Sequence, residues 1–312
     1  MSHPNPSIVA FMDIGTNAIR MMVIRLRADG RPQVLEQRRQ LMRLGEDAFA
    51  TGRLRPDVMN RAALLCRQWI QAARAAGASD VVAVATSATR DAKNRRTFLR
   101  LLQARTGLKV RVLSGDEEAR LIYLGISRNM NLGTRQALFM DIGGGSTELI
   151  IGDRNQAHCL AMLKLGAIRL SNRYLKLNRE QSVSSDLYQR IRNEVFTHAQ
   201  KVIRQLRGHR MDLAIGSSGT IMALGDIAAR RWLKQRLQCP ATFSAARLRQ
   251  VIRQLCSLPL AQRRLMPGLQ PDRADIIIGG AAILETLIEE LNIRRLVISD
   301  RNLRDGLVIE YR

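Results

Sequence analysis

Apolar and polar positions alternate along the chain in blocks that predict strands and helices in turn. The short apolar runs that predict strands are residues 8–11, 19–24, 80–86, 110–113, 137–141, 147–151, 212–215 and 295–298. Amphipathic stretches predict helices at 56–77, through Phe98, Leu101 and Leu102, and at 114–127, 184–207 and 245–256. Strands that alternate with helices in this way are typical of an α/β sheet with covered faces.

The tetrapeptide Met-Asp-Ile-Gly occurs twice, at residues 12–15 and again at 140–143. Each copy lies between two apolar runs, which predicts a strand, a tight glycine turn and a second strand, with one carboxylate at the turn. Glycine lets backbone N–H groups close around an anion at such a turn. Two hairpins of this kind predict two related lobes that face each other across a phosphate-sized cleft.

Length and composition fit a globular protein. The 312 residues suffice for two domains, and the 46% apolar content is ordinary. Residues 1–7 lack the apolar core of a signal peptide, and no window approaches the ~20 apolar residues of a membrane span. The four cysteines show no metal spacing, which indicates reduced thiols. We therefore expect a cytoplasmic protein with no membrane partner.

The charge is strongly positive, with 50 cations against 27 acids and a formal net charge of +23. All but six of the cations are arginines, whose planar guanidinium binds phosphate oxygens bidentately. Codon bias in a GC-rich genome also explains a preference for arginine over lysine, although it does not explain the surplus of cations. Nucleic acid, a phosphate polymer and a nucleotide all stay open as partners.

The segment 141–148, Asp-Ile-Gly-Gly-Gly-Ser-Thr-Glu, is the most specific local signal. Successive glycines offer unhindered N–H donors, and the hydroxyl that follows them can reach phosphate oxygens. Asp141 is a candidate ligand for a divalent metal, and Glu148 is a candidate to orient a water molecule. A plain glycine-rich hairpin is the alternative. The residues predicted to bind phosphate are Gly143, Gly144, Gly145 and Ser146.

The first glycine turn supplies a matching set of donors. Thr16 and Asn17 follow its glycine, and Asp13 is a second candidate carboxylate for the metal. Arg90 follows the strand at 80–86, where ligands of open α/β sheets bind. We predict that Arg90 binds phosphate, and the alternative is a surface ion pair with Asp91.

Two further motifs lie at predicted helix starts. Ser114 and Glu117 have the spacing of a capping box, which leaves Glu118 as the better candidate to deprotonate an attacking water. The alternative for Glu118 is a solvated first-turn acid that interacts with the helix dipole. A second predicted anion-binding turn precedes a helix, although a capped glycine turn would also explain it; its residues are Gly216, Ser217, Gly219 and Thr220.

Several catalytic constellations are missing from the sequence. It has no Walker-type Gly-Lys-Thr, and its four histidines show no metal spacing. No nucleophile stands out with a histidine and an acid as partners, so attack by activated water is favoured over a covalent enzyme intermediate. The pair Gly279-Gly280 could be an adenosine loop, but a glycine pair that packs helices is the preferred interpretation.

Taken in order, these motifs resemble the Ppx/GppA family of exopolyphosphatases and guanosine-pentaphosphate phosphohydrolases, within the actin-like ATPase superfamily. The segments that carry the resemblance are 13–17, 85–94, 114–125, 141–148, 216–220 and 299–307. The resemblance implies an α/β fold of two ribonuclease-H-like lobes with a cleft between them. It assigns 1–125 plus about 300–312 to the first lobe and 126–299 to the second, without the C-terminal HD-type domain of long members.

The resemblance also implies roles for individual residues. Glu118 would be the general base, Asp141 and Glu148 would lie beside Mg²⁺ and water, and Asp13 would be a further metal-site carboxylate. The cofactor would be Mg²⁺, with room for a monovalent cation such as K⁺, and the protein would be a homodimer. Asn302 stands where the family has glycine, which predicts a left-handed backbone there. The residues that complete the terminal phosphate site would be Thr16, Asn17 and Arg90.

Four functions follow from these features. The first is an exopolyphosphatase that releases orthophosphate from inorganic polyphosphate, because the cation surplus suits a phosphate polymer. The second is hydrolysis of the 5′ γ-phosphate of pppGpp to give ppGpp, which needs a guanosine pocket. The third is a non-catalytic sensor of polyphosphate or (p)ppGpp. The fourth is an actin-like sugar kinase or ATPase, which needs adenine recognition.

Overall fold

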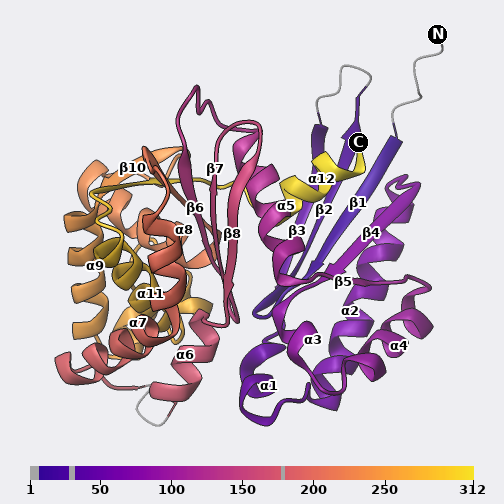
Figure 1. The fold of residues 1–312 in the computed structure, drawn as a ribbon. Helices are drawn as coiled ribbons and strands as arrows, with labels where there is room; N and C mark the ends of the chain where they lie inside the picture. The colour runs from indigo at the N-terminus through magenta and orange to yellow at the C-terminus, as the bar shows by residue number, and fades with distance from the viewer. Residues whose placement is uncertain (1–6, 28–31, 177–179) are drawn as a thin grey trace. The chain divides into compact units, whose positions relative to one another are not determined.

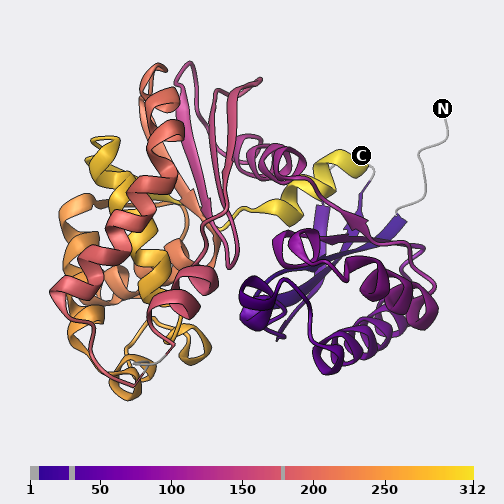
Figure 2. The same cartoon turned by 60° about the horizontal axis from the view of Figure 1, so that its bottom comes forward.

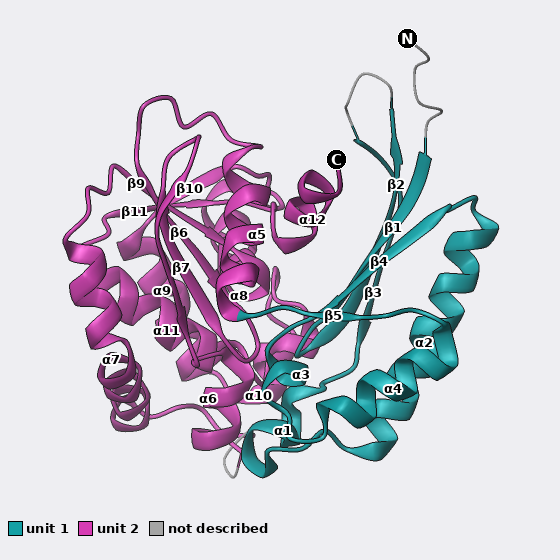
Figure 3. Cartoon of the chain, turned by 45° about the vertical axis from the view of Figure 1, so that its right-hand side comes forward, with its two compact units in different colours: residues 1–114 teal, residues 115–312 magenta. Residues whose placement is uncertain are grey.

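The computed structural model describes residues 7–27, 32–176 and 180–312 (Figure 1). The expectation that the chain has no signal peptide rests on residues 1–7. Of these, residues 1–6 lie outside the described range. The chain divides into two compact units, residues 1–114 and 115–312, which are coloured separately in Figure 3. Each unit is built around its own mixed β-sheet.

The sheet of unit 1 has the strand order β3-β2-β1-β4-β5. Its strands are β1 (Ser7–Ile14), β2 (Ala18–Leu26), β3 (Pro32–Leu41), β4 (Asp80–Ala85) and β5 (Arg111–Val112). β1 pairs antiparallel with β2 and parallel with β4, and its apolar sequence is buried over its last six residues. β3 is an edge strand with a largely exposed, polar sequence. The predicted strand–glycine turn–strand at residues 8–24 is confirmed.

The helices of unit 1 are α1 (Gly45–Thr51), α2 (Pro56–Ala75), α3 (Ser87–Asp91) and α4 (Arg95–Thr106). Helix α2 begins with proline, whose missing N–H is not needed in the first turn. It packs against α4 over one face of the sheet (Figure 2). Trp69, Ile70, Phe98 and Leu102 from these two helices belong to the core of unit 1.

The sheet of unit 2 repeats the topology of the first. Its order is β10-β11-β9-β6-β7-β8, in which β6 pairs antiparallel with β7 and parallel with β9. Each strand of unit 1 thus has a counterpart in unit 2: β1 to β5 correspond, in that order, to β6, β7, β8, β9 and β11. The remaining strand, β10, adds an antiparallel edge. The predicted repeat of two related lobes is confirmed. The strands are β6 (Ala137–Ile142), β7 (Thr147–Gly152), β8 (Ala157–Leu163), β9 (Leu213–Ser217), β10 (Ala241–Ser244) and β11 (Arg295–Ile298).

Helices cover both faces of the second sheet. One face forms the main core with α6 (Ala167–Tyr174), α7 (Ser185–Arg207), α8 (Ser218–Ala228), α9 (Ala245–Ser257) and α11 (Ile277–Glu290). On the other face, Tyr123 of α5 (Gly115–Ser127) meets Phe139 edge to face, with ring centroids 5.4 Å apart. Three short elements complete the unit: the π-helix η1 (Ala229–Leu233), α10 (Leu260–Arg264) and the 3₁₀-helix η2 (Pro271–Arg273).

The last helix, α12 (Leu303–Tyr311), packs against α5. The predicted division placed both segments in the first lobe. In the structure both belong to unit 2, because α5 packs against β7 and β8 and holds α12 there. Along the chain the boundary between the two compact units falls after residue 114, and the predicted division into lobes stays a prediction.

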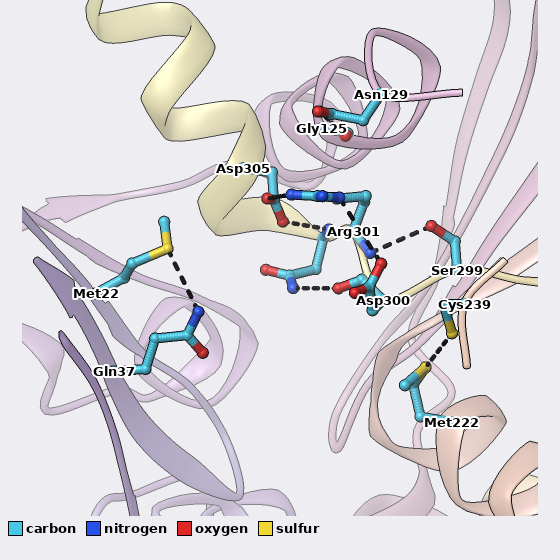
Figure 4. A network of polar contacts seen from close by, with 11 residues as sticks. Met22, Gln37, Gly125, Asn129, Met222, Cys239, Ser299, Asp300, Arg301 and Asp305 are labelled. Carbon is cyan, nitrogen blue, oxygen red and sulfur yellow. Dashed lines mark hydrogen bonds and ion pairs between the residues drawn. The ribbon is translucent and has the colours of Figure 1, made fainter. Parts of the chain in front are cut away.

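The predicted left-handed conformation of Asn302 is wrong. Its φ of −158° is extended, and it is the N-cap of α12. The Asn302 side chain accepts from Arg304 N, and Asp305 accepts from Asn302 N, which completes a capping box. The Asp305 carboxylate also accepts from the Arg301 guanidinium (Figure 4). The asparagine side chain therefore caps the helix at this position, and glycine could not do so because it has no side chain.

The glycine pair of α11 packs helices, as preferred from the sequence. A Cβ on Gly279 would lie 2.7 Å from the carbonyl oxygen of Ala167 in α6, and one on Gly280 would lie 2.5 Å from the Thr220 hydroxyl in α8. The backbone of α11 can approach both helices this closely only without side chains. Within the described residues, none of the helices combines the length and apolarity needed to cross a membrane.

Candidate active site

The parallel pairing of β6 with β9 brings two predicted anion-binding loops together in unit 2. Met140 is paired with Gly216, and Asp141 with Ser217. The glycine turn at 143–146 follows β6, and the turn that opens α8 follows β9. Both loops therefore lie at the carboxyl ends of neighbouring parallel strands, which is where open α/β sheets bind ligands.

The carbonyl oxygens of the three glycines in the turn are bound by α6. Gly143 O accepts from Ala167 N, and Gly144 O accepts from Ile168 N, each at 2.9 Å. Gly145 O accepts from the Arg169 guanidinium at 3.0 Å. The start of α6 thus fixes which way the peptide planes of the turn point.

The N–H groups of the turn are left for another acceptor. Gly143 N donates to Ser146 O and closes the turn. Among the described residues, the N–H groups of Gly144, Gly145 and Ser146 donate to no backbone oxygen. Consecutive N–H groups in a tight turn make an anion-binding concavity. The turn is therefore suited to receive phosphate oxygens, and phosphate binding by these residues stays a prediction.

Gly166 is a site residue that the sequence reasoning missed. A Cβ on this glycine would lie 2.4 Å from Gly145 N and 2.5 Å from Gly144 O. The turn thus rests directly on the backbone of residue 166, just before α6 begins. The only signal in the sequence is one glycine ahead of a short helix, and that pattern is too common to identify a site.

Asp141 and Glu148 lie opposite each other in the β6–β7 pairing. Their exposed fractions are 8% and 1%, so both carboxylates are buried. The Ser217 hydroxyl donates to Asp141 Oδ2 at 2.6 Å. The turn between these two acids, residues 143–146, is the glycine turn predicted to bind phosphate, and we call it the phosphate turn.

These carboxylates fit a magnesium site. No group of three or more His, Cys, Asp or Glu side chains with metal-ligand geometry occurs in the described part of the chain. Mg²⁺ usually takes one or two carboxylates from the protein and completes its shell with water and substrate phosphates. The oxygen donors of Asp141 and Glu148 are of this kind, and they flank the loop that would hold the phosphate.

The first turn of α8 adds further polar groups. Ser218 has a positive φ of 72°, and its hydroxyl donates to Ile142 O at 2.6 Å, which joins α8 to the end of β6. Helix α8 has 11 residues, and its N-terminus carries a partial positive charge. Of the four residues predicted here, Ser217 contacts Asp141 and Thr220 packs on Gly280. Gly216 is the next-to-last residue of β9 and lies opposite Met140.

Arg273 is a second residue that the sequence reasoning missed. A Cβ on Gly219 would lie 2.1 Å from its guanidinium, so the cation packs on the glycine at the start of α8. The side chain is buried, and its Nε donates to Gln270 Oε1 at 2.9 Å. In the sequence Arg273 is one of many arginines, and only the fold places it beside an anion-binding helix start.

Glu118 lies in the first turn of α5, on the side of the helix that is buried. Helix α5 packs against β7, the strand that carries Glu148, and against β8. The alternative of a solvated first-turn acid does not describe it, because its exposed fraction is 8%. Its role as a general base stays a prediction, as does the capping box of Ser114 and Glu117.

The predicted residues of unit 1 also gather at the carboxyl ends of parallel strands, β1 and β4. The Thr16 hydroxyl lies 2.7 Å from the Ser87 hydroxyl and accepts from Ala88 N at 3.2 Å. These contacts join the first glycine turn to the start of α3. Arg90 of α3 donates from its guanidinium to Leu113 O at 3.1 Å, and Asp13 forms an ion pair with Arg20 at 3.7 Å.

Asn17 is buried with its carboxamide unsatisfied. Its exposed fraction is 8%, and within the described residues neither Oδ1 nor Nδ2 has a hydrogen-bond partner. Its backbone oxygen is well bonded, since it accepts from Met42 N and Arg43 N. A buried carboxamide without partners costs stability. Asn17 is therefore better suited to hold a ligand than to hold the fold.

A family model for the Ppx/GppA phosphatase family matches residues 23–311. The chain belongs to the Ppx/GppA phosphatase family. The match begins after Asp13, Thr16 and Asn17, so their roles rest on the local geometry of unit 1.

Solved structures of similar proteins cover nearly the whole Ppx/GppA chain. An exopolyphosphatase from Cytophaga hutchinsonii has a TM-score of 0.91 and 22% identity, with 98% of this chain and 97% of that one covered. An exopolyphosphatase-like protein has a TM-score of 0.87 and 27% identity over the same shares. The Ppx/GppA family member from Aquifex aeolicus has a TM-score of 0.80 and 25% identity, again over 98% and 97%.

Each unit of this Ppx/GppA protein has its own cluster of candidate site residues. In unit 2 the phosphate turn, the two opposed carboxylates and the start of α8 lie at the ends of β6 and β9. In unit 1 the glycine turn and the start of α3 lie at the ends of β1 and β4. The two clusters occupy corresponding places in the repeated topology.

Proposed function

We propose that this Ppx/GppA protein is an exopolyphosphatase that hydrolyses the terminal phosphoanhydride bond of inorganic polyphosphate. The observation that carries the proposal is the glycine turn of unit 2. The carbonyl oxygens of its three glycines are bound by α6, and among the described residues three successive N–H groups have no backbone acceptor. A turn of this kind suits the oxygens of a terminal phosphate group.

The reaction is a displacement by water. Glu118 accepts a proton from the water as its oxygen bonds to the terminal phosphorus. The bond from that phosphorus to the bridging oxygen breaks, and the bridging oxygen leaves with its electron pair on the shortened chain. The products are orthophosphate and a polyphosphate shorter by one unit. The N–H groups of Gly144, Gly145 and Ser146 stabilise the charge on the phosphate oxygens during the transfer.

Asp141 and Glu148 would hold Mg²⁺. When bound, the ion neutralises charge on the phosphate oxygens and polarises the phosphorus toward attack. Ser217 keeps the Asp141 carboxylate in place through its 2.6 Å hydrogen bond. Glu148 is also the residue proposed to orient the attacking water.

The cluster in unit 1 is proposed to bind phosphate oxygens as well. The buried Asn17 carboxamide, which has no hydrogen-bond partner among the described residues, would donate from Nδ2. The Thr16 hydroxyl is fixed by Ser87 and Ala88, so little side-chain freedom is lost when it binds. Arg90, half-buried in the last turn of α3, would contribute a guanidinium.

The choice of polyphosphate rests on charge. A formal net charge of +23 raises the rate of encounter with a polyanion, and the advantage falls as salt rises. The first similar structure described above is itself named an exopolyphosphatase. Hydrolysis of pppGpp uses the same chemistry, but it also requires recognition of guanosine.

The test is phosphate release with Mg²⁺ from short polyphosphate, long polyphosphate, pppGpp and ATP in parallel, with Glu118→Gln as the blank. We expect the highest kcat/KM on polyphosphate, with an advantage that shrinks as salt is raised. A higher kcat/KM on pppGpp would assign the protein to the second function. Tight binding without turnover on all four would make it a sensor, and rapid turnover of ATP would point to a kinase or ATPase.

A further inference from the structure

The end of helix α8 is irregular in a way that points to a second binding site. The helix passes at Ala229 into the π-helix η1, which carries Arg230, Arg231 and Trp232. Lys234 follows with a positive φ of 57°. π-Helical turns are rare and frequently occur at functional sites, and a non-glycine residue at positive φ is uncommon. Both features lie in one short segment.

A hollow of about 790 Å³ adjoins this segment. Volumes of roughly 300–1,000 Å³ are usual for small-molecule sites. The hollow lies within unit 2, between the end of α8, helix α9 and the loop before η2. Its lining has three guanidiniums and no carboxylate; the nine residues are Ile227, Arg230, Arg231, Gln250, Arg253, Gln254, Ser257, Met266 and Pro267.

The lining keeps a surplus of positive charge. Arg230 is paired with Asp226 at 3.1 Å. Arg231 donates to the neutral carboxamide of Gln254 at 2.8 Å, and Arg253 is exposed and has no ion pair with any described residue. Only one of the three guanidiniums is therefore paired with an acid among the described residues, and helix α9 contributes no acid of its own. Guanidiniums in such a cluster bind phosphate oxygens well.

The lining is also partly apolar, and this favours a nucleotide over a bare phosphate chain. Ile227, Met266 and Pro267 form one part of the wall. A bare phosphate chain gains nothing from such a surface, whereas a nucleotide has a flat base that can bury area there. Gln250 and Gln254 offer amide donors and acceptors to the edge of a base.

We propose that this hollow is a nucleotide-binding site. The phosphates contact the guanidiniums of Arg230, Arg231 and Arg253, and the base rests on the apolar wall within reach of the two glutamines. The site is separate from the phosphate turn, because the 11 residues of α8 lie between the two and span roughly 16 Å at about 1.5 Å per residue. Binding here is independent of the reaction proposed above.

Trp232 offers a direct readout. Arg231 lies over its ring at 5.0 Å and Arg247 at 5.6 Å. When a bound phosphate draws the Arg231 guanidinium away from the Trp232 ring, the fluorescence emission of Trp232 changes. The chain has two tryptophans, and in a Trp69→Phe background Trp232 is the sole emitter. Titrations at fixed ionic strength without Mg²⁺ would use ATP, GTP and inorganic tripolyphosphate.

A matched pair of variants tests the location. Gln250→Ala with Arg253→Ala removes a glutamine and an arginine three residues apart on α9. Arg100→Ala with Gln103→Ala removes the same pair from α4, where both side chains are also exposed. We expect saturable binding of ATP or GTP, weakened at least ~10-fold by the α9 pair and changed less than ~2-fold by the α4 pair.

Three results would overturn the site. One is the absence of a saturable Trp232 response to either nucleotide at millimolar concentration. Another is tripolyphosphate binding as tightly as ATP with the same sensitivity to the α9 pair, which would mean that the hollow takes bare phosphate. The third is equal weakening by both pairs, which would mean that only net charge matters. Melting temperatures of both pairs check that the fold is kept.

Discussion

The Ser217 hydroxyl donates a 2.6 Å hydrogen bond to the Asp141 carboxylate, and the two residues are register partners on the parallel strands β9 and β6. The phosphate turn begins two residues after Asp141. One short bond between strands thus fixes a carboxylate beside the turn. Substitution of a residue that orients a metal ligand in this way typically lowers metal affinity by roughly 10–100-fold.

Ser217→Ala should therefore change the Mg²⁺ requirement. Without the hydroxyl, the Asp141 carboxylate loses its fixed orientation, and we expect the Mg²⁺ concentration for half-maximal activity to rise ~10-fold. The control is Ser184→Ala, which removes a hydrogen bond to Leu187 N at the cap of α7. That change should cost about 1 kcal/mol of stability and leave the Mg²⁺ dependence alone. Equal Mg²⁺ curves for Ser217→Ala and wild type would remove Asp141 from the metal site.

Asn17→Ala should weaken substrate binding without weakening the fold. The side chain has no hydrogen-bond partner among the described residues, so its loss removes no hydrogen bond to any of them. We expect KM for polyphosphate to rise ~10-fold or more and the melting temperature to stay or rise. In the control, Asn94→Ala, the carboxamide bonds both Leu54 N and Leu54 O. That variant should unfold more easily, by about 1 kcal/mol for each bond, with KM unchanged. A destabilised Asn17→Ala with normal KM would make Asn17 structural.

Gly166→Ala should disturb the phosphate turn. Its Cβ would meet Gly145 N at 2.4 Å, so the turn must move, and overpacking of this kind costs about 1–3 kcal/mol. We expect turnover to fall ~10-fold or more because the N–H groups no longer converge. Gly208→Ala is the control, since its nearest contact is at 3.3 Å and its φ is −74°. Normal turnover in Gly166→Ala would show that the turn does not need its support from residue 166.

Alkaline pH should destabilise the protein in part through Cys66. Burial raises the pKa of this thiol from 9.0 to about 12. Between these values the unfolded chain releases the thiol proton and the folded chain keeps it, so the free energy of unfolding falls as pH rises. The loss is about 1.4 kcal/mol per pH unit for this group. Urea unfolding at pH 8 to 10.5 should give a shallower decline in Cys66→Ala, and parallel declines would contradict this account.

Much of the fold could be predicted from the sequence, because the signals were long or repeated. The two copies of Met-Asp-Ile-Gly identified two hairpins, and both sheets share one topology. Asn302 was predicted wrongly, because residue preference alone does not reveal that its side chain caps α12. The assignment of α5 and α12 to a unit depends on packing between distant segments, for which the sequence has no local signal.

The site was predictable where glycine and carboxylate occur together in one motif. Residues 143–146 and 217–220 adjoin because β6 pairs with β9, which the strand order alone could not establish. Gly166 and Arg273 act through contacts with residues more than 20 positions away in the chain. The direction of the carbonyl oxygens in the glycine turn is set by α6 and cannot be read from the motif.

The most direct test of the central claim compares Glu118→Gln with Glu117→Gln in phosphate release from polyphosphate at saturating Mg²⁺. The two acids are neighbours in the first turn of α5, but Glu118 is buried and Glu117 is partly exposed. If Glu118 activates the water, its variant should lose at least ~10²-fold in kcat with substrate affinity kept, and Glu117→Gln should stay within a few fold of wild type. Unchanged kcat in Glu118→Gln, or an equal loss in both variants, would contradict Glu118 as the general base.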